Sequence, residues 1–214
     1  MALAESGVDC ELVDENPWEW RMSFLAKNPA GELPLLELEN GQLLCGVYAI
    51  TEFINEDGVT GSSQARRVSI FPGNRDDRAE VRRLVDWFHG KFDREVSRDL
   101  LFEKVYQRMR SDGGAAPDPE ILRASRANLK YHLAYISYLA DARRWLAGDE
   151  ISFADLSAAA HISVIDYLGE MLWQEYPASK AWYQRVKSRP SFRTVLADRV
   201  PGTPPPAWYA DLDF

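Results

Sequence analysis

Cysteine and histidine, which often carry nucleophilic or metal chemistry, are few in this chain and widely spaced. The 214 residues include two cysteines, Cys10 and Cys45, and three histidines, His89, His132 and His161. The histidines show no ligand spacing such as His-x-x-x-His, so we assign no metal. We interpret both cysteines as small buried hydrophobic residues, although Cys45 can also be read as a redox thiol. These residues therefore predict no catalytic group.

Ser152 and Asp155 stand three residues apart at the start of an apolar stretch, ISFADLSAAA. In a capping box the serine oxygen accepts from a backbone N–H of the first turn, and the acidic side chain accepts from the backbone N–H of the serine. We therefore predict a structural role for this pair, at the beginning of a buried helix, rather than a catalytic one.

Three acidic residues, Glu95, Asp99 and Glu103, fall at i, i+4 and i+8 of a predicted long helix. Like charges at this spacing repel weakly, and Arg94 and Arg98 lie beside them and can offset the repulsion. Two interpretations remain open. The three residues form a solvated face with intrahelical ion pairs, or they form a ridge directed at a domain cleft or a partner.

The C-terminal segment PGTPPPAWYADLDF combines a proline run with aromatic and acidic residues. Aromatic anchors within an acidic segment suit a groove lined with Arg or Lys on another protein. The alternative is a tail that folds back and buries Trp208 and Tyr209. The two interpretations are compatible if Trp208 and Tyr209 dock while the last four residues stay available to a partner. These four are Asp211, Leu212, Asp213 and Phe214.

Composition limits the classes of function. Hydrophobic residues make up 46% and charged residues 27% of the chain, which is typical of a globular protein. A net charge of −8 argues against a nucleic-acid binder. The sequence has no apolar run long enough to span a bilayer and no secretory signal at its start, so we expect no membrane contact and a cytoplasmic location.

The secondary structure predicted to position these residues changes along the chain, from mixed strand and helix to helix alone. Residues 10–15 alternate apolar and polar like a strand. Asn40-Gly41 predicts a tight hairpin, and a helical pattern follows it. Residues 58–75 are rich in Gly, Ser and Arg, as in a linker. Beyond them one long amphipathic helix leads a series of helical patterns.

We therefore expect four segments: a small α/β unit over 1–57, a linker over 58–75, an all-helical unit over 76–200 and the tail over 201–214.

Three stretches resemble the cytosolic glutathione transferases, NPAGELPLLELENGQLL with AITEFI, ISFADLSAAA, and KAWYQRVKSRPSFR. The resemblance implies an α/β thioredoxin-like domain followed by an all-α helical bundle. It also implies a cis bond between Leu33 and Pro34, which exposes the Leu33 backbone to an extended thiol peptide such as glutathione. The family's opening strand and its thiol-activating loop have no counterpart, so we expect the chain to start partway into the domain.

A further departure concerns the family's Glu/Gln-Ser pair, which binds the γ-glutamyl group. Gly46 and Val47 stand at those positions, so two side-chain contacts to glutathione are lost. With Leu33 and Pro34 they would form only a vestigial site, and we expect no cofactor.

The helical half and the tail resemble, in particular, a bacterial branch of this family that regulates cell division. That resemblance implies binding to filaments of the tubulin-like protein FtsZ, as a homodimer and without catalysis. The alternative is a glutathione transferase that conjugates glutathione to small electrophiles and whose true start lies upstream. A stress or transcription regulator on the same fold is a third alternative.

Overall fold

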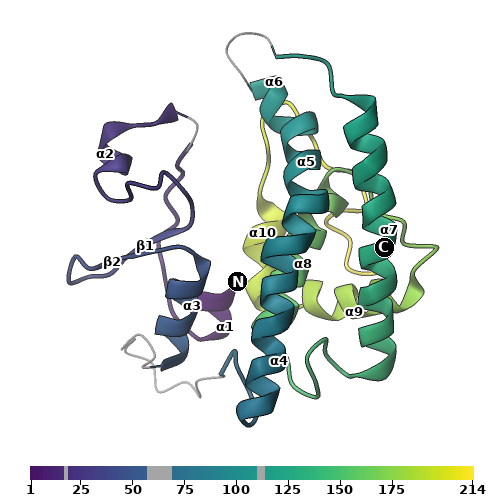
Figure 1. Ribbon diagram of the computed structural model, residues 1–214, viewed down its shortest axis with the longest axis horizontal. Helices are drawn as coiled ribbons and strands as arrows, with labels where there is room; N and C mark the ends of the chain where they lie inside the picture. The colour runs from purple at the N-terminus through teal and green to yellow at the C-terminus, as the bar shows by residue number, and fades with distance from the viewer. Residues whose placement is uncertain (17–18, 57–68, 110–113) are drawn as a thin grey trace. The chain divides into compact units, whose positions relative to one another are not determined.

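The computed structural model describes residues 1–16, 19–56, 69–109 and 114–214. The chain divides into two compact units, Ala2–Ile70 and Phe71–Phe214 (Figure 1). Most of the linker predicted over 58–75 lies outside the described residues. Its last residues, from Phe71 onward, belong to the second unit. Ile70, which ends the first unit, and Phe71 are both buried.

The first unit contains short helices and one hairpin. Its elements are α1 (Ala2–Glu5), α2 (Met22–Leu25), β1 (Leu35–Glu37), β2 (Leu43–Cys45) and α3 (Val47–Glu56). The two strands pair antiparallel, with Leu36 opposite Leu44. The predicted turn is confirmed, because Asn40 Oδ1 accepts from the Gln42 N–H at 2.9 Å. Gly41 takes the left-handed conformation that glycine tolerates, with φ of +82°.

Two expectations for this unit are wrong. Residues 10–15 form no strand, and Leu12 and Val13 are 77% and 79% exposed. A strand needs a partner, and among the described residues β1 and β2 pair with each other. Cys10 and Cys45 are both exposed rather than buried. Cys10 lies in the unpaired segment, and Cys45 ends β2 just beyond two half-buried leucines.

The second unit begins with one continuous helix, as the sequence predicts. It runs through α4 (Arg75–Asp86), the π-helical η2 (Trp87–Ser97), α5 (Arg98–Leu101), the π-helical η3 (Phe102–Tyr106) and α6 (Gln107–Met109). Asn74 caps its start and Asp77 completes a capping box. Its apolar stripe is fully buried at Leu84, Phe88 and Phe92. Figure 1 shows this helix running alongside α7 (Pro119–Ala142).

The remaining helices are α8 (Phe153–Tyr167), α9 (Pro177–Lys187), the 3-10 turn η4 (Pro190–Phe192) and α10 (Arg193–Ala197). α8 packs against α4, η2 and α9, and it is buried on nearly all sides. The sequence predicts this central place from its run of apolar and small residues. Within the described ranges, no helix combines the length and apolar content needed to cross a membrane.

Candidate functional site

The vestigial site predicted from the sequence lies around Pro34. The Leu33–Pro34 bond is cis, and Leu33 is 47% exposed just before β1. Pro34 O accepts from the Gly46 N–H at 2.9 Å. The structure therefore brings Pro34 and Gly46 together, at the end of the hairpin where α3 begins.

The start of α3 offers backbone N–H donors but no polar side chain at Gly46 and Val47, the two positions where the family has its Glu/Gln-Ser pair. Gly46 has φ of +85°, and a Cβ added there would meet nothing within 4 Å. The Val47 side chain ends in methyl groups, where the family's serine would offer a hydroxyl to the γ-glutamyl group. The side chain of Thr51 bonds back to Val47 O at 2.8 Å. An anion could be held here only by the backbone N–H groups of the helix start.

The predicted acidic ridge divides into residues with different roles. Glu95 accepts a hydrogen bond from Lys91, and its Oε2 lies 3.1 Å from His132 Nε2. The Lys91 bond is the main cause that lowers the pKa of Glu95. One quarter of the Glu95 side chain stays exposed, and Asp99 is half-buried. Both residues keep some access to solvent.

Glu103 departs from the prediction that it meets a partner. It is 2% exposed, and its Oε2 accepts from the Asp118 N–H at 2.7 Å. Asp118 in turn caps α7, its Oδ1 accepting from the Glu120 N–H at 2.8 Å. Glu103 thus fixes the start of the next helix, because its helical phase at i+8 turns toward α7 and away from solvent.

The tail is docked on the helical unit through Tyr209. This residue is 2% exposed, and its hydroxyl lies 2.8 Å from Ser163 Oγ. Its ring packs edge-on against Tyr167, with centroids 5.1 Å apart. Trp208, in contrast, is 48% exposed. The expectation that both aromatic residues are buried therefore holds for Tyr209 alone.

Phe214 is also docked, which corrects the expectation that the last four residues stay available together. Its ring lies 5.0 Å from that of Trp173 and 6.1 Å from that of Tyr183. Its backbone O accepts from Gln184 Nε2 at 3.4 Å. Four tail residues remain exposed between the two anchors, namely Ala210, Asp211, Leu212 and Asp213.

A buried cation beneath the tail was not found by sequence reasoning. Lys187 has a side chain with no exposed area, and its Nζ lies 3.5 Å from Asp166 Oδ2, which is equally buried. Burial lowers the pKa of Lys187 and raises that of Asp166, and their mutual attraction opposes both shifts. Lys187 ends α9 and reads in sequence as an ordinary exposed helix-end cation.

The Ser152–Asp155 pair forms the capping box of α8. Asp155 Oδ2 accepts from the Ser152 N–H at 3.0 Å, and Ser152 Oγ accepts from the Ala154 N–H at 3.3 Å. Asp155 Oδ1 also accepts from Trp182 Nε1 and from the Leu146 N–H, both at 2.9 Å. The carboxylate therefore ties α8 to α9 and to the preceding loop.

Two of the three histidines, His89 and His161, form a half-buried polar network with Ser97. His89 Nδ1 lies 3.1 Å from His161 Nε2, and Ser97 Oγ lies 2.8 Å from His161 Nδ1. Burial lowers the pKa of His161 to about 3. Sequence spacing could not reveal this network, because its members are up to 72 residues apart. Among the described residues, no group of three or more His, Cys, Asp and Glu is placed to hold a metal.

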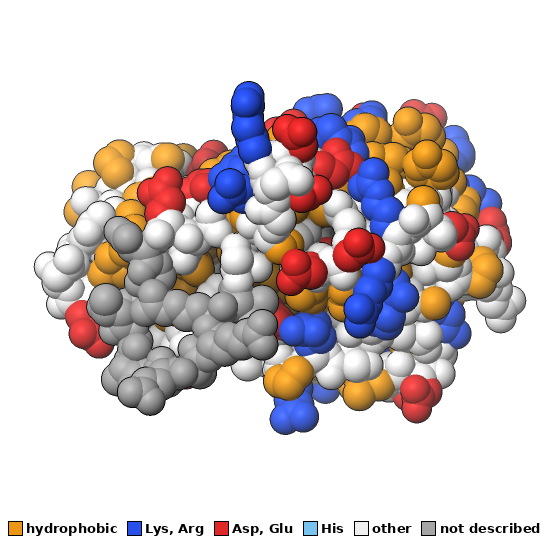
Figure 2. All heavy atoms as spheres, turned by 90° about the horizontal axis from the view of Figure 1, so that it is seen from below, with side chains coloured by type: hydrophobic (Ala, Val, Ile, Leu, Met, Phe, Trp, Pro, Cys, Tyr) orange, Lys and Arg blue, Asp and Glu red, His pale blue; other side chains and the backbone are white. Residues whose placement is uncertain are grey.

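The face drawn in Figure 2 carries Lys and Arg side chains interspersed with Asp and Glu.

Two known domain families match this chain, one in each half. Residues 1–57 match the glutathione S-transferase N-terminal domain, and residues 98–190 match its C-terminal domain. The chain belongs to the glutathione S-transferase family, as its motifs predict.

Within the family, the chain is 42% identical over 217 residues to FtsZ-localized protein A of Caulobacter vibrioides, covering 100% of this chain and 91% of that protein. The solved structure of FzlA from C. crescentus is similar to this chain, with a TM-score of 0.91 at 41% identity, covering 100% and 92% of the two chains. A glutathione S-transferase structure from Sinorhizobium meliloti gives a TM-score of 0.91 at 48% identity, covering 99% and 91%.

Proposed function

We propose that this protein binds FtsZ filaments and regulates bacterial cell division, as a non-catalytic member of the glutathione S-transferase family. The observation that carries the proposal is the similarity along the full chain to FtsZ-localized protein A. The protein acts in the cytoplasm, where filaments of a tubulin-like protein assemble, and it acts as a homodimer. Size-exclusion chromatography with light scattering tests the homodimer.

The proposed contact is acidic. Asp211 and Asp213 are exposed around Leu212, which is 41% exposed. Glu95 and Asp99 add carboxylates on the long helix. A partner surface that presents Lys or Arg around an apolar recess would complement the tail segment, since charge complementarity directs docking and the apolar side chain adds buried area.

The absence of catalysis is supported by the site at the end of the hairpin. Gly46 has no side chain, and the Val47 side chain cannot form a hydrogen bond. Neither residue can therefore bind the charged γ-glutamyl group of glutathione through its side chain. Lost hydrogen bonds to charged groups cost about 1.5–3 kcal/mol each. We therefore propose that the protein uses no glutathione cofactor.

Cosedimentation with FtsZ polymerised in GTP tests the filament contact. The protein should pellet with filaments and stay in the supernatant without them. Removing residues 207–214 would be a poor variant, because it removes the anchors Tyr209 and Phe214. The substitutions Asp211→Asn and Asp213→Asn together remove two charges and keep both anchors, so this variant should pellet markedly less.

The matched control is Asp141→Asn with Asp149→Asn, two exposed aspartates elsewhere on the helical unit. It changes the net charge equally and should pellet like the wild type. If the wild type does not pellet with filaments, the proposed function is wrong. If both double variants pellet equally, the filament contact lies away from the tail.

A second candidate, a glutathione transferase, is favoured by one observation, the cis Leu33–Pro34 bond beside the exposed Leu33 backbone. Calorimetry with glutathione and a conjugation assay with chlorodinitrobenzene test it. Heat of binding together with turnover would establish the transferase, and neither is expected.

A further inference from the structure

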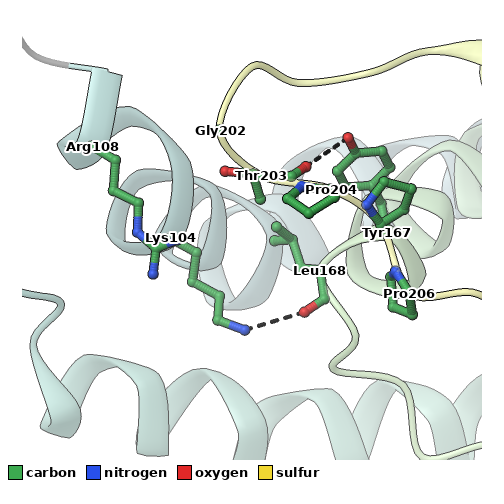
Figure 3. A pocket seen from close by; sticks show the side chains of 9 residues that line it. Lys104, Arg108, Tyr167, Leu168, Gly202, Thr203, Pro204 and Pro206 are labelled. Atoms are coloured by element: carbon green, nitrogen blue, oxygen red, sulfur yellow. Dashed lines mark hydrogen bonds between the residues drawn. The ribbon is translucent and has the colours of Figure 1, made fainter.

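The helical unit contains a cavity that the proposed function does not use. Its volume is about 340 Å³, within the range of small-ligand sites, and it lies between the end of the long helix and the first half of the tail. Figure 3 shows Lys104 and Arg108 extending from the helix, with Tyr167 and the prolines of the tail facing them.

The tail side of this cavity is held in place by hydrogen bonds. Tyr167 Oη donates to Thr203 O at 2.8 Å and accepts from the Val200 N–H at the same distance. Pro206 O accepts from the Tyr209 N–H at 3.0 Å, and Tyr209 is itself buried. The prolines therefore form a preformed apolar wall, as is usual for ligand pockets.

The helix side of the cavity carries surplus positive charge. Lys104 Nζ donates to Leu168 O at 3.2 Å and pairs with Glu170, which also accepts from Arg126 at 2.7 Å. One carboxylate is thus shared by two cations. Arg108, one helical turn beyond Lys104, has no hydrogen bond or ion pair within the part of the chain that the structure describes.

We propose that this cavity binds a carboxylate carried by a short apolar chain or ring. The planar guanidinium of Arg108 would accept the carboxylate in a two-point contact. The apolar part would pack on Leu168 and on the rings of Pro204 and Pro206. The proposal is independent of FtsZ binding, since it concerns a ligand of the isolated protein.

Calorimetry on the full chain with hexanoate and with hexanamide tests the proposal. The two probes have nearly the same shape, and only hexanoate is charged. Hexanoate should bind about tenfold or more tightly than hexanamide, because a charged hydrogen-bond partner is lost in the amide. Equal binding of the two probes, or no binding of hexanoate, overturns the proposal.

Substitutions then locate the site. Arg108→Gln should weaken hexanoate binding about tenfold, and Arg108→Lys should weaken it less, because lysine keeps the charge and loses the planar fork. The matched control is Arg123→Gln, an exposed arginine on α7 outside the cavity. It should bind hexanoate like the wild type. Unchanged affinity in Arg108→Gln would place the ligand elsewhere and overturn the assignment.

A last comparison identifies the source of the carboxylate. The dipeptide N-acetyl-Gly-Leu presents a leucine side chain beside a terminal carboxylate. The same dipeptide with an amidated C-terminus lacks that charge and serves as its control. Tighter binding of the dipeptide than of hexanoate would indicate the C-terminus of another protein, and the reverse would indicate a free small acid. Inorganic phosphate should bind far more weakly than either. If phosphate binds as tightly, the apolar wall plays no part and the proposal is wrong.

Discussion

Lys187 Nζ lies 3.9 Å from the centre of the Phe214 ring, so the last residue of the chain covers a buried cation. The rings of Tyr183 and Tyr209 lie 5.6 Å and 5.7 Å from the same nitrogen. Aromatic faces attract cations, and they do so more strongly where water is excluded. The docked tail and the Lys187–Asp166 pair are therefore energetically linked.

Phe214→Ala should lower the free energy of unfolding by about 2 kcal/mol, since it removes both apolar burial and the cation–π contact. Urea denaturation followed by circular dichroism measures the change. Phe214→Leu should lose less, because leucine restores much of the burial without an aromatic face. Leu212→Ala, on an exposed neighbour, should stay within about 0.5 kcal/mol of the wild type. A similar loss at both positions would contradict the docked arrangement.

The Lys187–Asp166 pair should behave non-additively. Asp166→Asn leaves a buried ammonium without its counter-charge, and Lys187→Met leaves a buried carboxylate alone, so each should cost about 3 kcal/mol. The double variant leaves no unpaired charge and should lose less than the sum. A double-mutant cycle by denaturation measures this coupling. Additive losses would show that the two residues do not interact.

Glu103→Gln should destabilise the helical unit by about 1–2 kcal/mol, because a neutral amide is a weaker acceptor for the Asp118 N–H. Thermal unfolding measures the loss. Glu120→Gln, on an exposed residue of the same turn, is the control and should change stability little. We expect Glu103→Gln to pellet with FtsZ as the wild type does, at a temperature where both are folded. A selective loss of pelleting would restore Glu103 to the contact surface.

The low pKa of His161, about 3, makes stability depend on pH. In the unfolded chain a histidine titrates near its ordinary value of about 6.5. The neutral form is favoured on folding, so the stabilisation is present above about pH 6.5 and is lost as the pH falls from there toward 3. The free energy of unfolding should therefore fall by up to about 1.4 kcal/mol per pH unit within this window.

Denaturation at pH 7.5 and pH 5.0 tests the assignment to His161. His161→Gln should show a smaller difference between the two pH values. Ser97→Ala removes one hydrogen bond and keeps the histidine, so its difference should match that of the wild type. Equal pH dependence in all three proteins would assign the titration to other groups.

Val47→Ser should strengthen glutathione binding, because it places a hydroxyl on the first residue of α3, beside free backbone donors. Calorimetry with glutathione on this variant and on the wild type measures the effect. Val47→Ala, which shortens the side chain without adding a hydroxyl, is the control. We choose Val47 over Gly46, since a side chain at Gly46 would be strained at its positive φ. Equal heats in all three proteins would show that the hydroxyl does not restore the site.

Local sequence patterns predicted the elements that depend on neighbouring residues. The Ser152-x-x-Asp155 spacing indicated the start of α8, and Asn40-Gly41 indicated the hairpin. The apolar stripe indicated one helix from the start of α4 to the end of α6. Each of these features needs only short-range hydrogen bonds or a constant helical period, which a single sequence displays.

Contacts between distant segments could not be predicted in the same way. Phe214 looked available because nothing near it in sequence covers it, and its partners lie in α9 and the preceding loop. Glu103 looked like part of an exposed ridge, since periodicity alone does not say which helix packs on which face. Cys45 was expected to be buried from residue type, and its exposure follows from its place at the end of a two-stranded hairpin.

The two tail anchors also have an entropic consequence. With Tyr209 and Phe214 both fixed, the intervening residues form a short loop closed at each end, rather than a loose terminal strand. Ordering a backbone costs roughly 1–2 kcal/mol per residue, and here that loss is incurred when the protein folds. A partner that meets Asp211 and Asp213 therefore encounters charges already held at a set spacing, and little of its binding energy is spent on ordering the tail.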